Sequence, residues 1–371
     1  MRVLGVVTLV SPHGEYGGPL RVAVNQLREL ASRRHDVLLA GTHRGYDGTP
    51  PTEIDGVPVR LFPARTFMPG VGFAGLTSVS LMRWLRASVD DFDIVHVHAA
   101  RDMVTLPAAR TAQRAGVRTV LQTHGMIDES RNPLAIPLDA AVTRPALRGA
   151  DAVTYLTEPE RRSLEVVARG GVSLSPLSNG VPVAPLDQRA REVVEVLYLA
   201  RLTPRKNAMM FAQVAADLAL QFPDVRFRLV GPDEGSGADV ARVIASADLG
   251  DRLCWEGPLP PGKTLSRMRH AAIYVLPSVH EPYPMSVLEA MSVGLPVVVT
   301  TSCGLAGFVS AHDAGAVIEP SAADLRAAIA ALLSDPDAAQ RAGARGREAV
   351  IEKKSMAAIA DRLETLYRWD E

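Results

Sequence analysis

Short apolar runs alternate with longer amphipathic runs along both halves of this 371-residue chain. A short apolar run fits a buried strand, and an amphipathic run fits a helix with one face on a core. Strands that alternate with helices pair in parallel and are covered by helices on both faces of the sheet. The pattern predicts an α/β protein with strands at 3–10, 36–40, 94–98, 119–123, 152–155, 173–177, 193–200, 226–230, 273–276, 296–300 and 316–319.

The chain is too long for one core. A single hydrophobic core stops growing at about 250 to 300 residues, so 371 residues predict two domains. The segment 179–189 is rich in proline and lacks periodicity, as expected of a linker between them. The last part of the chain is polar, rich in alanine and helical in pattern, and we expect a final helix at about 356–368.

Composition excludes several classes of protein. A net charge of −1 argues against a nucleic-acid partner, and two cysteines without metal spacing favour a reducing compartment. The first ten residues read as a strand rather than a signal peptide. No apolar run approaches the roughly 18 residues that span a bilayer. We therefore expect a cytoplasmic protein, peripheral to the inner face of the membrane at most.

Two glutamates, Glu281 and Glu289, lie in the segment His-Glu-Pro-Tyr-Pro-Met-Ser-Val-Leu-Glu. Proline suits the first turn of a helix but not its interior, so Pro284 predicts a loop that carries Glu281 and a helix that carries Glu289 about one turn in. Unpaired backbone N–H groups at the helix start attract phosphate, and carboxylates accept hydrogen bonds from sugar hydroxyls. The arrangement suits a nucleotide sugar; an ordinary solvated helix start is the alternative.

Two cations, Arg201 and Lys206, follow the apolar run 193–200. Pro204 is predicted to open a helix, which places Arg201 at the carboxyl end of a strand and Lys206 in the first helical turn. Ligands of parallel sheets bind at this end of the strands, and a bound anion compensates a cation in a helix's first turn. The two side chains suit a diphosphate, with a pair of surface cations as the alternative.

These residues carry a family resemblance. The stretch from Arg201 to Glu289, continued by Ala-Met-Ser-Val-Gly-Leu-Pro-Val, resembles the C-terminal half of the retaining glycosyltransferases of family 4. The similarity covers nearly the whole chain through matches at Gly17-Gly18, Asp93-Ile-Val-His96-Val-His98, His124-Gly125, Asn179-Gly180-Val181, Val230-Gly231 and Glu256-Gly257. No single match is specific, but their order and spacing are.

The resemblance implies the GT-B architecture, in which two Rossmann-like parallel-sheet domains face a central cleft. The N-terminal, acceptor-binding domain would be residues 1–183 joined by the C-terminal helix, about 356–371. The C-terminal domain, residues 184–355, would bind the nucleotide sugar.

The implied activity is transfer of a hexosyl unit from a nucleotide-diphosphate sugar, UDP- or GDP-linked, to a hydroxyl group. It proceeds with retention and without a metal, and the sugar nucleotide is a co-substrate rather than a cofactor. The acceptor would be a glycan, a lipid-linked glycan or a small molecule, and we favour bacterial polysaccharide or glycolipid assembly. The implied catalytic residues are His124, Arg201, Lys206 and Glu281. The implied nucleotide-sugar-binding residues are Gly17, Gly18, Asn179, Arg201, Lys206, Glu281, Met285, Ser286 and Glu289.

Each group has an implied role. Arg201 and Lys206 would stabilise the charge on the leaving diphosphate, the electrostatic effect that usually dominates such catalysis. Glu281 would hold hydroxyls of the transferred hexose, and Glu289 the ribose diol. The leaving phosphate would take the acceptor's proton in a front-face attack, since the sequence offers no convincing covalent nucleophile.

Backbone N–H groups would complete the phosphate site. Those of Met285 and Ser286, at the helix start, would contact the phosphates. In the loop 13–19, after the first strand, Gly17 and Gly18 would allow positive φ and close approach to a phosphate or sugar.

Histidines offer a rival interpretation. The resemblance places His124 against the transferred sugar, while His96 and His98 share one face of a strand and read as a core residue and an acceptor-side contact. A hydrolase with a divalent metal held by these three histidines, with Asp91 and Asp93 nearby, is the alternative. The aspartates precede the strand, so they should not converge with the histidines. A sugar-nucleotide binding protein without transferase activity is a third possibility.

Three departures from the family pattern leave the specificity open. Tyr283-Pro284 replaces Phe-Gly and removes a backbone N–H near the sugar, Cys303-Gly304 replaces a Gly-Gly, and Arg34-His35 replaces a Gly-His. The apolar loop 67–76 and the cations of Arg83-Trp84-Leu-Arg86 suit a membrane surface, an acceptor-pocket wall or plain core, and core is the favoured interpretation.

Overall fold

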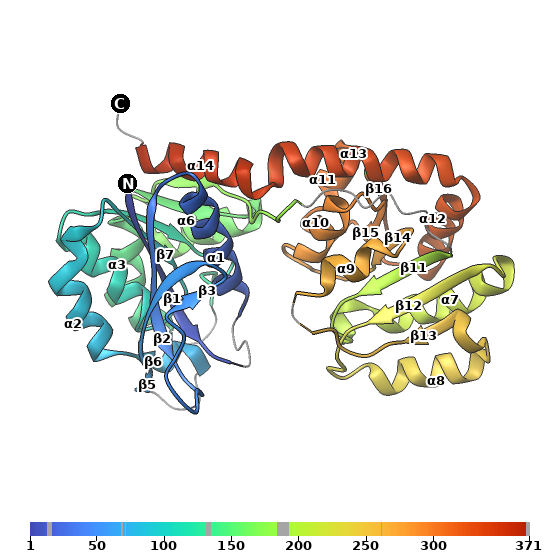
Figure 1. The fold of residues 1–371 in the computed structure, drawn as a ribbon, viewed down its shortest axis with the longest axis horizontal. Coiled ribbons are helices and arrows are strands. Elements are labelled where there is room, and N and C mark those ends of the chain that lie inside the picture. The colour runs from blue at the N-terminus through green and yellow to red at the C-terminus, as the bar shows by residue number, and fades with distance from the viewer. Residues whose placement is uncertain are drawn as a thin grey trace. The chain divides into compact units, whose positions relative to one another are not determined.

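The computed structural model describes residues 1–12, 17–67, 70, 72–130, 135–183, 193–260 and 262–368. Its contacts divide the chain into two compact units (Figure 1). Unit 1 comprises Met1–Gly180 and Met356–Glu371, and unit 2 comprises Val181–Ser355. Both are parallel sheets covered by helices, so the predicted α/β class is confirmed.

Unit 1 contains an eight-stranded sheet, among the described residues, in the order β10-β9-β8-β7-β1-β2-β4-β3. Neighbouring strands are parallel except for the β3–β4 hairpin. The strands are β1 (Arg2–Val10), β2 (Asp36–His43), β3 (Glu53–Ile54), β4 (Val57–Pro63), β7 (Ile94–His98), β8 (Arg118–Gln122), β9 (Ala152–Tyr155) and β10 (Leu174–Pro176). A separate short pair consists of β5 (Arg65–Thr66) and β6 (Leu76–Thr77). Sequence reasoning missed β3 to β6, because prolines within β4 and the shortness of the others hide the strand pattern.

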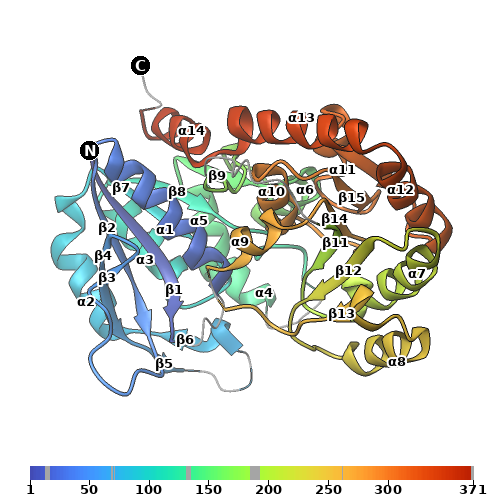
Figure 2. The ribbon, with the colours of Figure 1, turned by 45° about the vertical axis from the view of Figure 1, so that its right-hand side comes forward.

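Helices cover both faces of this sheet. They are α1 (Gly17–Ser32), α2 (Val79–Ser88), α3 (Thr105–Arg114), α4 (Ala135–Leu138), α5 (Arg144–Arg148), α6 (Glu158–Ala168) and α14 (Met356–Arg368), with a π-helical turn at Asp139–Thr143. One core lies under α2, α3, α5 and α6. The other lies under α1 and α14, which lie side by side (Figure 2). The C-terminal helix thus completes a core that begins with β1.

Unit 2 is an all-parallel sheet of six described strands in the order β13-β12-β11-β14-β15-β16. They are β11 (Val194–Leu199), β12 (Val225–Val230), β13 (Leu253–Trp255), β14 (Ile273–Leu276), β15 (Val297–Thr300) and β16 (Gly315–Ile318). The helices are α7 (Ala208–Gln221), α8 (Gly237–Ala247), α9 (Thr264–Arg269), α10 (Met285–Ser292), α11 (Ala306–Ala311), α12 (Ala322–Ser334) and α13 (Pro336–Lys354). Only β13, three residues long, was not predicted.

Local chemistry sets several of these boundaries. Ser321 caps α12 by accepting a hydrogen bond from the N–H of Asp324 at 3.1 Å. Asp335 does the same for α13, where Pro336 takes the first helical position. The sequence therefore ends one helix and starts the next within three residues.

Candidate active site

The sheet of unit 2 changes winding direction between β11 and β14. From β11 the chain adds β12 and β13 on one side, and from β14 it adds β15 and β16 on the other. Ligands of such sheets bind outside the carboxyl ends of the strands at this point. The loop after β11 carries Arg201 and Lys206, and the loop after β14 carries Glu281. The topology brings the two predicted clusters to one edge of the sheet.

Lys206 lies in a short 3₁₀ helix, Pro204–Lys206, and not in the first turn of α7 as predicted. Asn207 follows in the left-handed conformation, with φ of 57°, and α7 begins after it. The sequence-based error was to let Pro204 open α7, since a left-handed asparagine is a feature that periodicity does not reveal. The Asn207 amide donates to the carbonyl of Pro277 at 3.2 Å, which holds this turn against the end of β14.

Lys206 and Glu281 form a close ion pair. The Nζ of Lys206 donates to Oε2 of Glu281 at 2.6 Å, and the two side chains are only 11% and 10% exposed. A guanidinium nitrogen of Arg205 lies 3.6 Å from the same oxygen. Charges this buried need partners, because desolvation of a lone carboxylate or ammonium costs several kcal/mol. The pair fixes both functional groups before any ligand is bound.

The loop that carries Glu281 is held by backbone hydrogen bonds on two sides. The N–H of Val279 donates to the carbonyl of Arg205 at 2.9 Å. The N–H of Gly304 donates to the carbonyl of Glu281 at 2.8 Å. A Cβ at position 304 would lie 1.7 Å from the carbonyl oxygen of Pro282, so only glycine fits. The departure from the family pattern at Cys303-Gly304 is therefore packed directly behind Glu281.

Helix α10 begins beside this loop. Pro284 was predicted to lie in the first helical turn, but it is the N-cap and α10 starts at the next residue. The proline side chain has no acceptor that could cap the first N–H groups. Ser286 is held by a hydrogen bond with Tyr274 of β14. The Tyr274 hydroxyl lies 2.8 Å from the Ser286 Oγ and 3.0 Å from the carbonyl oxygen of Leu199. The N-terminal N–H groups of α10 point to a place suited to an anion. Sequence reasoning missed the role of Tyr274. Its position in the predicted strand 273–276 was the only signal that could have indicated it.

Arg201 and Glu289 have surroundings different from those of the Lys206–Glu281 pair. Arg201 is half exposed and its guanidinium contacts Glu234, beyond β12, at 2.8 Å. Glu289 lies in the second turn of α10 and is 8% exposed. The prediction of one carboxylate before the helix and one about a turn inside it is confirmed.

Unit 1 has a corresponding switch between β1 and β7. The residues 13–16 of the predicted glycine-rich loop lie outside the described part of the chain. Gly17 and Gly18 belong to α1 rather than to the loop, and Gly18 does not have the positive φ that was predicted. A Cβ at Gly18 would meet no heavy atom within 4 Å, so the start of α1 borders open space.

His124 follows β8 with a φ of 52°, and Glu160 holds its loop. Oε1 of Glu160 accepts from the backbone N–H of Gly125 at 2.6 Å and from the Thr123 hydroxyl at 2.5 Å. Glu160 is 8% exposed and stands at the start of α6, where Thr157 caps the helix. Sequence reasoning missed Glu160, although the spacing Thr-x-x-Glu is a known helix-start signal.

His124 and His98 touch. Nδ1 of His98 and Nε2 of His124 are 2.9 Å apart, and the rings stack with an interplanar angle of 11°. Burial lowers the pKa of His124 to about 3, and it lowers the pKa of His98 well below its usual value. Both imidazoles are therefore neutral near pH 7, and one ring nitrogen donates while the other accepts. His98 is an internal partner of His124 rather than an exposed contact.

Asn179 is buried at the end of unit 1. Its Oδ1 accepts from Nε2 of Gln122 at 3.0 Å, and Gln122 accepts in turn from Gln26 of α1 at 3.1 Å. A hydrogen bond with Asn179 partly offsets the lowering of the His124 pKa. The structure therefore places Asn179 in the surroundings of His124.

The metal alternative receives no geometric support. Asp93 accepts from the backbone N–H of Arg2, at the amino end of the sheet, as predicted. In the part of the chain that the structure describes, no three histidine, cysteine, aspartate or glutamate residues are placed to hold a metal ion. The histidines and aspartates do not converge.

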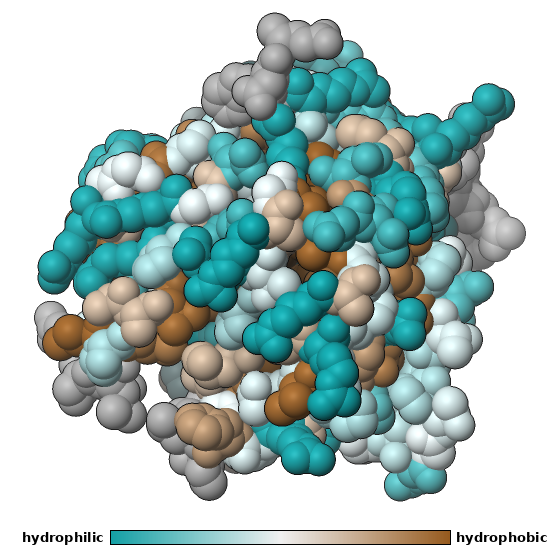
Figure 3. Space-filling model, turned by 90° about the vertical axis from the view of Figure 1, so that its left-hand side faces the viewer, coloured by the Kyte–Doolittle hydropathy of each residue, from teal (hydrophilic) through white to brown (hydrophobic). Residues whose placement is uncertain are grey.

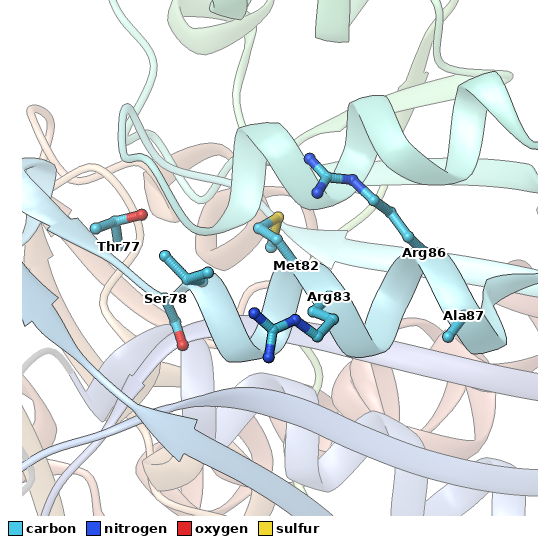
Figure 4. A pocket seen from close by; sticks show the side chains of 7 residues that line it. Thr77, Ser78, Met82, Arg83, Arg86 and Ala87 are labelled. Carbon is cyan, nitrogen blue, oxygen red and sulfur yellow. The ribbon is translucent and has the colours of Figure 1, made fainter.

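A groove of about 460 Å³ runs along α2 (Figure 4). Thr77 and Ser78 line its end, and Met82, Arg83 and Arg86 project from the helix. The favoured core interpretation of the apolar segments is confirmed in part: Leu76 and Leu85 are buried in a core and Trp84 packs against it, whereas Phe67 is 73% exposed. Val79, at the start of α2, is 61% exposed. On the side of unit 1 drawn in Figure 3, most side chains are hydrophilic and the apolar ones form small groups. Among the described helices none has the length and apolar character to cross a membrane.

Two family models match the chain. "Glycosyl transferase 4-like domain" matches residues 17–180, and "Glycosyl transferases group 1" matches residues 188–349. An alpha-D-kanosaminyltransferase of Streptomyces kanamyceticus is 25% identical over 74% of this chain and 70% of its own. A D-inositol 3-phosphate glycosyltransferase of Geodermatophilus obscurus is 27% identical over 86% of this chain and 78% of its own.

Solved structures share the fold over the full length. Sucrose-phosphate synthase from Thermosynechococcus elongatus superimposes with a TM-score of 0.71 at 20% identity, covering 99% of this chain and 98% of that one. Anabaena HepE in complex with UDP and glucose gives 0.72 at 16% identity, covering 99% and 100%. From the two models, the relatives and the fold, we conclude that the chain belongs to the retaining, group 1 glycosyltransferases of family 4 and is a nucleotide-sugar-dependent enzyme.

Proposed function

We propose that unit 2 binds a UDP-linked hexose at the edge of its sheet between β11 and β14. The observation that carries this proposal is the buried Lys206–Glu281 ion pair beside the start of α10. A Lys ammonium has three N–H donors, and Glu281 takes one of them, which leaves two for phosphate oxygens. Both cation contacts to Glu281 fall on Oε2, which leaves Oε1 for hydroxyls of the hexose.

The remaining groups act on the same ligand. The N–H groups of Met285 and Ser286 bind the phosphates, and Glu289 binds the ribose diol. Arg201 exchanges its exposed contact with Glu234 for the leaving diphosphate, which weak surface ion pairs permit. Charge developing on that diphosphate is stabilised by Lys206 and Arg201, and this lowers the barrier to departure.

His124 is the proposed residue of unit 1 that contacts the transferred hexose, and Gly17, Gly18 and Asn179 are further proposed binding residues of unit 1. Because the pKa of His124 is low, the ring stays neutral at working pH and hydrogen-bonds to the sugar without adding charge. The proton of the acceptor hydroxyl passes to the leaving phosphate. Retention then follows from attack on the face that the phosphate leaves.

The nucleotide is proposed to be UDP because proteins of the same fold are known in complex with it. The HepE structure is a complex with UDP and glucose, and a structure of TarM from S. aureus also contains UDP. The test is thermal unfolding in a chelator with UDP, GDP, ADP, CMP or dTDP. UDP at about 100 times its Kd should stabilise the chain by ~2.7 kcal/mol, and Glu289→Ala should abolish the shift. Stabilisation by a divalent metal alone, with none by any nucleotide, would refute the proposal.

A small polyhydroxylated ring is the proposed acceptor. Relatives are named for D-inositol 3-phosphate and for 2-deoxystreptamine, both small cyclic alcohols. This choice replaces the polysaccharide or glycolipid that the sequence favoured. Incubation with UDP-glucose and a panel of cyclitols, monosaccharides and lipid-linked glycans, followed by mass spectrometry, decides between them. A product found only with lipid-linked glycans contradicts the small-molecule acceptor.

Contact with a membrane surface is a separate proposal. The groove on α2 combines the exposed apolar Val79 with the cations of Arg83 and Arg86, a combination that favours anionic lipid. Sedimentation with phosphatidylglycerol vesicles should carry the protein down at low salt. Arg83→Glu with Arg86→Glu should release it, and equal binding to neutral phosphatidylcholine vesicles would argue against the proposal.

A further inference from the structure

A row of aromatic side chains runs through unit 1 from the C-terminal helix to His124. The hydroxyl of Tyr367, on α14, lies 2.7 Å from Nδ1 of His96. The His96 ring stacks on His98 at 4.8 Å between centroids and 14° between planes. His98 stacks on His124 at 5.1 Å and shares a hydrogen bond with it. The row links β7, the loop after β8 and α14.

The row is not what a purely structural core would select. His96 and His98 are each 2% exposed, and Nε2 of His96 is buried without a hydrogen bond of good geometry, although the Gln122 side chain partly offsets the lowering of the His96 pKa by burial. Apolar side chains of similar volume would avoid that cost, since a buried polar atom without a full hydrogen bond destabilises the fold. A buried polar atom left in this state calls for a reason other than stability.

Control of the His124 tautomer by hydrogen bonding would explain why these polar rings are buried here. A neutral imidazole has one N–H, and the partner of one nitrogen decides which nitrogen carries it. His124 itself has a left-handed backbone conformation and lies in a loop. The backbone alone does not fix the orientation of its ring. His98 supplies the bond to Nε2 and a parallel ring surface, and Tyr367 holds the other end of the stack through His96.

We propose that His98 is a positioning residue, which sets the orientation and tautomer of His124, and that Tyr367 of α14 supports it through His96. The inference rests on the proposed role of His124 at the transferred sugar. It assigns the C-terminal helix a part in catalysis besides closing a core.

The test compares His98→Asn, His98→Leu and Tyr367→Phe in the full chain. An Asn amide reaches about where Nδ1 of His98 lies, so it keeps the hydrogen bond, whereas Leu keeps volume alone. Partners that orient a metal-bound histidine typically contribute about 10- to 100-fold, and we expect a loss of about tenfold or more in kcat for His98→Leu. His98→Asn should restore most of it, with KM for the sugar nucleotide little changed. Tyr367→Phe should lower kcat by a smaller factor.

Two controls separate positioning from other effects. Glu364→Gln weakens the attachment of α14 to His35 without touching the row, so it should leave kcat unchanged. The ¹⁵N shifts of the His124 ring report its tautomer, and they should change in His98→Leu but not in Glu364→Gln. If His98→Leu does not fold, Tyr367→Phe and His98→Asn carry the comparison.

The outcomes are distinct. Full kcat and unchanged His124 shifts in His98→Leu overturn the inference, as does an equal loss of kcat in Glu364→Gln and Tyr367→Phe. Loss of activity in His124→Ala together with full activity in His98→Leu leaves the proposed function standing and removes only the positioning role. Full activity in His124→Ala removes the proposed role of His124 itself, and the inference with it.

Discussion

At the scale of single residues, the site of unit 2 depends on side chains whose substitution would disturb the position or charge of Glu281. Gly304 touches the carbonyl of Pro282, and Lys206 neutralises Glu281 in a place with little water. Neither constraint follows from residue type alone. Both arise because the loops after β11, β14 and β15 end at one sheet edge.

Gly304→Ala should displace the loop that bears Glu281. The added Cβ would lie 1.7 Å from a backbone oxygen, which cannot yield as a flexible side chain can. Calorimetric titration should show much weaker nucleotide-sugar binding. Gly307→Ala is the matched control, because a Cβ there meets nothing within 4 Å and α11 gains a better helix former. Equal affinity in the two variants would show that the loop adapts.

Lys206→Met should lower the free energy of unfolding by about 3 kcal/mol, since it leaves Glu281 buried without its main partner. Adding Glu281→Gln should recover part of that loss. Arg201→Ala, at the half-exposed pair with Glu234, should cost less than about 1 kcal/mol. Urea unfolding measures all three, and similar losses at both pairs would contradict the buried-pair interpretation.

At the scale of elements, the parallel sheets position the site through strand ends and helix starts. Tyr274 shows how two elements are joined. The Leu199 carbonyl can only accept, so the Tyr274 proton goes to it and Ser286 donates to the Tyr274 oxygen. The end of β11 is thereby tied to the start of α10 under the proposed phosphate site.

Tyr274→Phe should destabilise unit 2 by about 1 kcal/mol, because the partly buried Leu199 carbonyl and Ser286 hydroxyl each lose a hydrogen bond. It should also weaken UDP binding severalfold by loosening the start of α10. Ser286→Ala provides a double-mutant cycle with it. A coupling near zero in that cycle would mean that the hydroxyl contact carries no energy.

At the scale of the whole molecule, the chain leaves unit 1 at Gly180 and returns to it at Met356. Helix α14 buries Ile359, Leu363 and Leu366 beside α1. At its surface His35 contacts Glu364 at 2.9 Å, and Arg33 contacts both Asp361 and Glu364. Residues more than 300 positions apart thus close one core.

Glu364 should make the stability of unit 1 depend on acid. The hydrogen bond from His35, with help from Arg33, lowers the pKa of this carboxyl in the folded chain. Its stabilising effect is therefore complete above the unfolded pKa of about 4.3 and is lost as pH falls through the lowered folded value. Chemical unfolding between about pH 6 and pH 3 should show a smaller pH dependence for Glu364→Gln. Identical pH profiles of stability for the unaltered chain and Glu364→Gln would show that this carboxyl does not contribute to the acid dependence.

The sequence alone determined the class of fold, most strands, the final helix and the residue types of the site. It could do so because periodicity, proline and glycine act locally. Only the tertiary structure decided which groups meet: Lys206 and Glu281 are 75 residues apart in sequence, and His96 and Tyr367 are 271 apart. Such contacts depend on the order of strands in the sheets and on the packing of the C-terminal helix against unit 1. No local sequence pattern encodes either of these. The left-handed Asn207 and strand β4 were missed for the converse reason, since packing there overrides local preference.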